Sequence, residues 1–205
     1  DSESELDIGG LDSAHKLTIL ATLSYGAKLN FENNIITGIS NIHINDIVNA
    51  DKLGYKIKLI SEVSVKENKI YCETSPKLIN VNEPLANVDG VLNAINIETD
   101  QLQKLFLEGE GAGGKATASS VISDLYEIKS NSNILSLGYS VQKLINYKKL
   151  DSNEIESSYY IRITAKDITG VLSKITSYFN ESDISVKKIL QLPDTEKYQE
   201  NIPII

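Results

Sequence analysis

The stretch DIGGLDSAHKL, residues 7–17, decides how the first part of the chain is interpreted. Its two glycines end an acidic N-terminal segment, and Asp12 or Ser13 is placed to cap a helix that we expect over 14–27. Apolar residues cover most of the circumference of this helix, which predicts that it is buried. Asp12 and Lys16 are four residues apart, so they lie on one helical face.

This face carries groups that can move a proton. A lysine beside carboxylates serves proton transfer to or from a hydroxyl or carbonyl group, and Asp7 lies near enough in sequence to fold back towards Lys16. Burial lowers the pKa of a lysine, whereas neighbouring carboxylates raise it. Lys16 is therefore a base only if the effect of burial is the larger one. Otherwise it stays charged and serves as an acid or as an electrostatic clamp. The alternative is a helix cap with a surface ion pair, worth about 0.3–0.5 kcal/mol.

The following residues predict a series of short elements. We expect a helix over 46–54, capped by Asn45 or Asp46, and two strands over 55–65 and 69–74 joined by a hairpin turn at 66–68. Two more strands are expected over 93–98 and 104–108, and a helix of small residues over 116–128.

A glycine run, GEGAGG at 109–114, lies between the last of these strands and that helix. It matches the spacing G-x-G-x-x-G, but a dinucleotide fingerprint also needs a second strand ending in an acid about 20 residues on. We expect no strand at 129–133, and Glu110 places a negative charge where a pyrophosphate would lie. The run therefore indicates either a backbone that approaches the edge of a ligand or a tight turn with dense packing.

The last third of the chain changes character. Residues 129–157 are polar and poorly periodic, which is typical of a linker. Alternation then predicts a half-buried strand over 160–165. A helix around 171–179, a strand over 184–189 and a further strand that begins at Ile202 are expected after it.

Composition excludes several classes of function. The chain has 205 residues and a net charge of −8, which disfavours nucleic acid as a partner, and no apolar run approaches the roughly 20 residues of a membrane helix. One cysteine, Cys72, excludes an internal disulfide and any zinc site built from several cysteines, and with two histidines we predict no metal site. We expect Cys72 to pack within a strand and the compartment to be reducing. The chain contains no methionine and ends on apolar residues, so we expect both ends to be cuts in a longer protein.

Residues 1–130 resemble the homoserine dehydrogenase family. The stretch 7–17 is similar to the family's catalytic signature, and 53–60 is similar to the Leu-Gly-Tyr motif that begins one of its strands. Residues 83–86 and 90–94 are similar to the stretch that leads into the family's later strands. Residues 109–125 are similar to its glycine loop and the helix that follows. Residues 158–205 resemble an ACT domain, a small module that binds amino acids, on the pieces YYIRI (159–163), DITGVL (167–172) and DISV (183–186).

The resemblance implies an α+β fold in three parts. A mixed β-sheet covered by helices, which binds substrate and forms the dimer, is expected over 1–130, a linker over 131–157, and a partial ferredoxin-like βαββαβ ACT domain over 158–205. A Rossmann domain is implied upstream and is missing from this chain, so the fragment by itself is expected to be inactive.

The resemblance also implies an activity. The family interconverts homoserine and aspartate semialdehyde with NAD or NADP, in the cytoplasmic synthesis of threonine, methionine and isoleucine, as a homodimer with an amino acid such as threonine as effector. By this resemblance the catalytic residue is Lys16. The substrate-binding residues are Asp1, Asp7 and Asp12, and the cofactor-binding residues are Gly111 and Gly113.

Departures from the family pattern suggest an alternative function. Asp1 stands where the family usually has a glutamate that holds the substrate's ammonium, Glu110 where it has proline or alanine, Ser4 where it has proline, and Thr169 where its ACT domains have proline. The alternative hypothesis is a non-catalytic amino-acid sensor built on an old enzyme scaffold.

Overall fold

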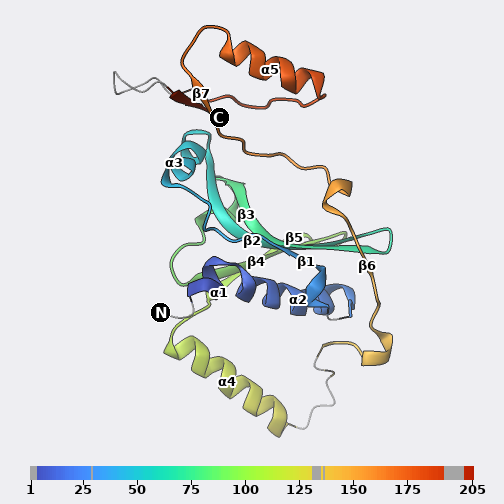
Figure 1. The fold of residues 1–205 in the computed structure, drawn as a ribbon. Helices are drawn as coiled ribbons and strands as arrows, with labels where there is room; N and C mark the ends of the chain where they lie inside the picture. Colours follow the sequence, from blue (N-terminus) through green and yellow to red (C-terminus); the bar gives the residue numbers. More distant parts are fainter. Residues whose placement is uncertain (1–3, 29, 131–134, 136, 192–200) are drawn as a thin grey trace. The chain divides into compact units, whose positions relative to one another are not determined.

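The computed structural model describes residues 4–28, 30–130, 135, 137–191 and 201–205 (Figure 1). The chain forms two compact units, which we call the sheet unit (1–41 and 56–155) and the tail unit (42–55 and 156–205). Residues 42–55 therefore pack with the C-terminal segment, although the sequence places them inside the first domain.

The sheet unit is built on a mixed four-stranded sheet. Its strands are β1 (Asn34–Ile36), β2 (Tyr55–Lys66), β3 (Lys69–Asn80) and β6 (Lys148–Lys149), and their order β1-β3-β2, with β6 also paired to β3, places β3 inside the sheet. Strands β1 and β6 each run parallel to β3. Glu67 and Asn68 have φ angles of 49° and 61°, which is the two-residue turn that matches the twist of a hairpin. The predicted hairpin between β2 and β3 is thus confirmed.

Helices α1 (Ser4–Ile8) and α2 (Leu11–Tyr25) precede this sheet in the chain. The buried face of α2 contributes Leu17 and Ala21 to a core shared with Ile70 and Cys72 of β3. The opposite face is exposed, because the sheet covers only one side of the helix. The prediction that α2 is buried around most of its circumference is therefore wrong.

The start of α2 also differs from the prediction. The helix begins at Leu11 rather than Ala14, and its N-cap is Gly10, whose carbonyl oxygen accepts the Ala14 N–H at 3.0 Å. Asp12 and Ser13 lie inside the first turn, so neither is the cap. Gly10 takes this place because its φ of 80° is left-handed, a conformation that glycine adopts without strain.

A second sheet in the sheet unit is an antiparallel hairpin of β4 (Leu92–Thr99) and β5 (Gln103–Glu110), followed by α4 (Gly114–Lys129). All three elements are predicted from the sequence, and the structure lengthens each by one or two residues at each end. Four short 3-10 helices complete the unit: Phe31–Asn33, Pro84–Asn87, Val141–Lys143 and Ser152–Glu154.

Part of the predicted linker is packed. Ile145 exchanges backbone hydrogen bonds with Gly26 and Lys28, β6 pairs with β3, and Leu150 is 7% exposed. These contacts use the backbone over a few residues, so they leave little hydrophobic periodicity to detect.

The tail unit contains α3 (Ile44–Lys52), β7 (Ile163–Lys166), α5 (Val171–Glu181) and β8 (Asn201–Ile204). Strands β7 and β8 pair antiparallel, which confirms the strand predicted at Ile202. The strand predicted over 184–189 is wrong, because this segment forms no ladder and its apolar side chains are 41–51% exposed. Pairing begins just after this segment, where Leu190 and Ile205 exchange two backbone hydrogen bonds.

Candidate functional site

The candidate site is built on the two-residue turn that joins α1 to α2. Ile8 ends α1, and its carbonyl oxygen accepts the Ile39 N–H at 2.9 Å. A Cβ added to Gly38 would overlap the Ile8 carbonyl oxygen and the Gly9 Cα, and a Cβ on Gly10 would come within 3.1 Å of the Thr74 Cγ2 on β3. The turn is therefore packed between the Thr74 side chain of β3 and the backbone of segment 37–39, and the contact at Gly38 leaves no room for a side chain.

This turn places the predicted acidic residues and the lysine. Asp12 and Lys16 lie in the first turns of α2, and their carboxylate oxygen and Nζ are 2.6 Å apart. Asp7 lies on the other side of the turn, in the last turn of α1, and its carbonyl oxygen accepts the Gly10 N–H at 3.1 Å. The structure thus brings Asp12 and Lys16 into contact and ties Asp7 to the same turn, whereas Asp1 lies outside the described residues.

These groups are open to solvent in this chain. The side chains of Lys16 and Asp12 are 65% and 47% exposed, so the pair as it stands resembles a surface ion pair. An open surface hollow of about 400 Å³ lies over the turn, lined by Ile8, Gly9, Leu11 and Ser40. Asp7, Asp12 and Lys16 do not line this hollow, although they lie in the helical turns on either side of it.

The glycine run serves two purposes in the structure. The Asn93 side chain occupies the place that a Cβ on Gly111 would take, and the Gly111 N–H donates to the Val91 carbonyl oxygen at 2.9 Å. Dense packing thus explains the glycine at 111. Gly113, the N-cap of α4, has a φ of 118°, and a Cβ there would meet no atom within 4 Å. Gly109 and Gly114 also face open space, so a ligand could approach the backbone there.

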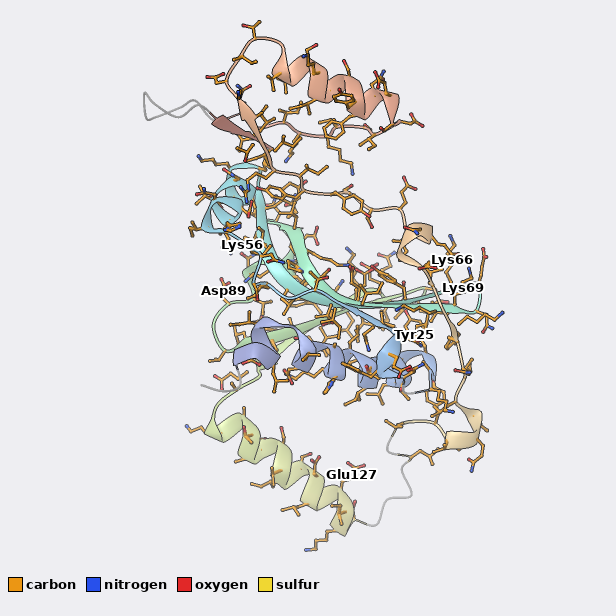
Figure 2. The ribbon with its side chains drawn as sticks, in the orientation of Figure 1. Tyr25, Lys56, Lys66, Lys69, Asp89 and Glu127 are labelled. Atoms are coloured by element: carbon orange, nitrogen blue, oxygen red, sulfur yellow. The ribbon has the colours of Figure 1, made fainter. Side chains whose placement is uncertain are left out.

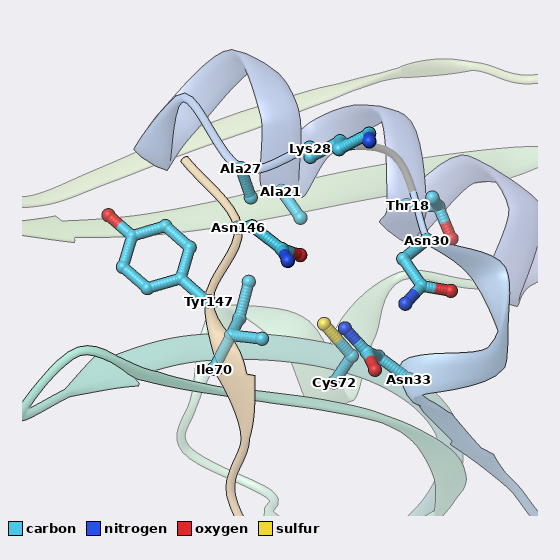
Figure 3. A pocket seen from close by; sticks show the side chains of 10 residues that line it. All are labelled: Thr18, Ala21, Ala27, Lys28, Asn30, Asn33, Ile70, Cys72, Asn146 and Tyr147. Atoms are coloured by element: carbon cyan, nitrogen blue, oxygen red, sulfur yellow. The ribbon is translucent and has the colours of Figure 1, made fainter. Parts of the chain in front are cut away.

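A small interior cavity lies between α2, β3 and the segment before β6 (Figure 3). It is lined by Thr18, Asn33, Cys72 and Asn146, among others, and its volume of about 10 Å³ holds at most one water molecule. Burial raises the pKa of Cys72 to about 11, because an apolar environment disfavours the thiolate. This confirms that Cys72 packs inside the sheet unit, and the cavity is too small for a substrate.

Surface lysines of the sheet unit hold strands to neighbouring loops. Figure 2 labels Lys56 and Asp89, whose Nζ and carboxylate oxygen are 3.8 Å apart, and Lys58 donates to the same carboxylate at 2.5 Å. Lys69 pairs with Glu154 at 2.5 Å. Hydrogen bonds from Lys58 and Lys69 hold the pKa values of Asp89 and Glu154 below their usual range. These pairs are exposed and lie away from the α1–α2 turn in sequence, and we assign them no chemical role.

Sequence reasoning missed a polar network in the tail unit. Asp46 is not the cap of α3, because the helix begins at Ile44 and its N-cap is His43. The Asp46 carboxylate accepts hydrogen bonds from the His43 backbone N–H, the Tyr160 hydroxyl and the Arg162 guanidinium. The signal available in the sequence was that Arg162 is the chain's one arginine, although nothing local pairs it with Asp46.

Two classes of site find no support among the residues that the structure describes. No group of three histidines, cysteines, aspartates or glutamates is placed to hold a metal ion in this part of the chain. None of the described helices is long and apolar enough to cross a membrane.

Comparison with known proteins gives a consistent result. Residues 1–126 match the family model described as homoserine dehydrogenase. The curated homoserine dehydrogenase of Helicobacter pylori is 38% identical over 187 residues, covering 91% of this chain and 44% of the relative. That of Pseudomonas aeruginosa is 33% identical, covering 100% of this chain and 48% of the relative. The chain thus spans about half the length of the curated relatives it matches.

Solved structures agree with the sequence comparison. The crystal structure of a homoserine dehydrogenase from Thiobacillus denitrificans superposes with a TM-score of 0.83 at 32% identity, covering 98% of this chain and 46% of that one. A hyperthermophilic archaeal homoserine dehydrogenase mutant in complex with NADPH superposes with a TM-score of 0.50 at 31% identity, covering 64% of this chain and 36% of that one.

Proposed function

The chain belongs to the homoserine dehydrogenase family, and from this premise we propose that the protein it forms part of interconverts L-homoserine and L-aspartate 4-semialdehyde with NAD or NADP. The observation that carries this proposal is the contact between Asp12 and Lys16 beside a turn that backbone packing fixes in place. The residues of this chain would bind and orient the substrate and exchange one proton with it.

The acidic residues suit the amino group of the substrate. L-Homoserine carries an ammonium, and hydrogen bonds between an ammonium and a carboxylate are about twice as strong as neutral ones. Asp12 and Asp7 are placed at the turn to make them, and Asp1 is proposed as a third partner. Together they would hold the substrate with its hydroxyl group towards Lys16.

Lys16 is proposed to exchange the proton of that hydroxyl group. Oxidation of the alcohol removes one hydride and one proton, and the nicotinamide cofactor supplies the hydride chemistry when it is bound. In this direction the neutral amine of Lys16 would accept the proton of the hydroxyl group, and in the other direction its ammonium would return one proton. Because Lys16 is 65% exposed in this chain, the water-excluded surroundings that such a base requires would come from the substrate and from the rest of the protein.

The glycine loop fits the edge of such a cofactor. Gly113 leaves its backbone uncovered, and it leads into α4, whose first N–H groups favour an anionic group. Gly111 and Gly113 would hold the cofactor by their backbone, with Gly111 kept in place by Asn93. We propose that a Rossmann domain outside this chain makes the other contacts, including those that choose between NAD and NADP.

The remaining assignments extend this proposal to the whole protein. Residues 1–130 would form the catalytic and substrate-binding part, 131–157 the connection, and 158–205 part of an ACT domain through which an amino acid such as threonine exerts feedback. The protein would act as a cytoplasmic homodimer in the synthesis of threonine, methionine and isoleucine.

One observation favours the alternative of a non-catalytic amino-acid sensor. Glu110 is exposed in the glycine loop and adds a negative charge close to the proposed cofactor contacts. The two functions differ in one requirement, because a sensor binds an amino acid without reducing a nicotinamide.

The role of Asp12 is tested by changing its charge and the charge of the substrate together. In the complete protein, Asp12→Asn is expected to lower kcat/KM for L-homoserine about 10–100-fold, since a hydrogen bond to a charged group contributes about 1.5–3 kcal/mol. For 4-hydroxybutyrate, which lacks the ammonium, the same variant is expected to lower kcat/KM by a smaller factor, because this substrate is affected only by the changed charge beside Lys16. An equal loss with both alcohols would show that Asp12 does not bind the amino group.

A further inference from the structure

Helix α3 has an unusual position in the chain. It lies in sequence between β1 and β2, yet residues 42–55 pack with the tail unit rather than with the sheet unit. The chain therefore passes from the sheet unit to the tail unit after Asn41 and returns before Lys56. The segment that contains α3 is thus joined covalently to the sheet unit at both ends, but it packs as part of the tail unit.

The first turn of α3 is anchored by Asp46. This carboxylate is 6% exposed and accepts the Arg162 Nε–H at 2.7 Å and the Tyr160 hydroxyl at 2.9 Å. The His43 backbone N–H donates to its second oxygen at 3.1 Å. Burial alone would raise the pKa of Asp46, but hydrogen bonds from Arg162, His43 and Tyr160 outweigh it and hold the pKa below its usual range. Two of the three groups that donate to this carboxylate, the Tyr160 hydroxyl and the Arg162 guanidinium, therefore come from residues 160–162.

The last turn of α3 is anchored separately. Lys188 Nζ donates to the carbonyl oxygen of Leu53, the C-cap of α3, at 2.7 Å. The same ammonium lies 4.8 Å from the centre of the Tyr55 ring, a distance at which a cation and an aromatic face attract each other. Within the tail unit, both ends of α3 are thus bound by residues that lie more than 100 positions later in the chain.

A short covalent path leads from α3 to the candidate site. Four residues, 40–43, separate α3 from Ile39, whose N–H donates to Ile8 at the end of α1. Gly38 packs against the backbone of Ile8 and Gly9, and the Thr37 N–H donates to the Thr74 carbonyl oxygen at 2.8 Å. These four residues are therefore the covalent connection between α3 and the segment that packs against the turn between Asp7 and Asp12.

We propose that α3 is a coupling element through which the tail unit sets the geometry of the Asp12–Lys16 site. Lys188, Arg162 and Asp46 are positioning residues in this proposal, since they act on the site through α3 and segment 37–39. The effect on catalysis rests on the proposed function, whereas the mechanical coupling does not.

The coupling is tested by hydrogen exchange on the complete protein, with two neighbouring lysines as a matched pair. Lys188→Ala removes the contact with Leu53 and Tyr55, while Lys187→Ala removes an ammonium whose partner among the described residues is Ser158 Oγ, outside α3. We expect Lys188→Ala to speed exchange at least fivefold in α3 and at the Ile39 amide, and Lys187→Ala to leave both unchanged. Lys188→Arg, which keeps a donor and a cation, should restore protection.

Three outcomes would overturn the coupling. One is faster exchange in α3 with an unchanged Ile39 amide, the second is no change in either place, and the third is an equal effect of Lys187→Ala. Arg162→Lys provides an independent variant, because lysine keeps the charge but loses the planar fork of guanidinium donors, and it should reproduce the exchange pattern of Lys188→Ala.

Kinetics then separate this proposal from the proposed function. In an active enzyme, Lys188→Ala is expected to raise KM for L-homoserine at least fivefold with kcat within twofold, and Lys188→Arg to restore it. An inactive complete protein would count against the proposed function, and the exchange pattern would still decide the coupling. An active enzyme whose KM stays unchanged while exchange at Ile39 rises would contradict the claim that the coupling reaches the site.

Discussion

Replacing Lys16 by alanine in the complete protein is expected to lower kcat for L-homoserine about 10²–10⁴-fold, the usual contribution of a positioned acid or base. Lys16 Nζ is the only cationic group that the described structure places within 4 Å of Asp12, so no neighbour at that distance can take over its proton. The affinity for the cofactor is expected to change little, because the proposed cofactor contacts are made by the glycine loop and by a Rossmann domain proposed to lie outside this chain. Steady-state kinetics of homoserine oxidation measure both quantities.

The variant is expected to fold normally. Lys16 is 65% exposed and its ion pair with Asp12 is of the surface kind, which contributes little to stability. Lys143→Ala, a change at an exposed lysine in the 3-10 helix over 141–143, serves as the matched control for loss of a positive charge. A Lys16→Ala enzyme with near-normal kcat would remove Lys16 from the mechanism, and equal losses in both variants would point to a general effect of charge.

Introducing a methyl group at Gly38 is expected to have the largest effect on stability. A Cβ there would overlap the Ile8 carbonyl oxygen and the Gly9 Cα, and these are backbone atoms that cannot rotate away. Gly38→Ala should therefore lower the free energy of unfolding by about 1–3 kcal/mol, the range for overpacked sites. Because the displaced atoms belong to the α1–α2 turn, KM for L-homoserine should also rise. Urea denaturation and steady-state kinetics test the two effects.

Gly114→Ala is the control for this substitution. Gly114 is the first residue of α4, and an added Cβ would meet no atom within 4 Å, so stability should be unchanged or slightly improved. If Gly38→Ala were as stable as Gly114→Ala, the turn would not be held by the backbone contacts described above. A destabilised Gly38→Ala protein with unchanged KM would separate the clamp from the site.

The elements that the sequence predicts well are those determined locally. The β2–β3 hairpin follows from a turn at 66–68 flanked by alternating residues, and the β4–β5 hairpin and α4 follow from equally local patterns. The Asp12–Lys16 contact is predictable for the same reason, because helical spacing alone brings the two side chains together. Its distance of 2.6 Å agrees with that expectation.

What the sequence does not predict depends on distant partners. Asp46 and Arg162 are 116 positions apart, so nothing local distinguishes Asp46 from an ordinary helix cap. The close packing at Gly10 involves Thr74, 64 positions later in the chain, and the glycine at 111 is explained by Asn93. A segment such as 184–189 alternates like a strand but finds no partner in the described structure, which shows that alternation predicts a ladder only where another strand is available.

Reduction of a nicotinamide by the complete protein is the measurement that tests the central claim most directly. The protein is mixed with L-homoserine and either NAD or NADP, and the absorbance of the reduced nicotinamide is followed, with Lys16→Ala and Lys143→Ala measured in parallel. The proposed function predicts homoserine-dependent reduction of at least one cofactor, retained in Lys143→Ala and nearly abolished in Lys16→Ala. No reduction of either cofactor by a folded protein that binds L-threonine in calorimetry would contradict it and favour the amino-acid sensor.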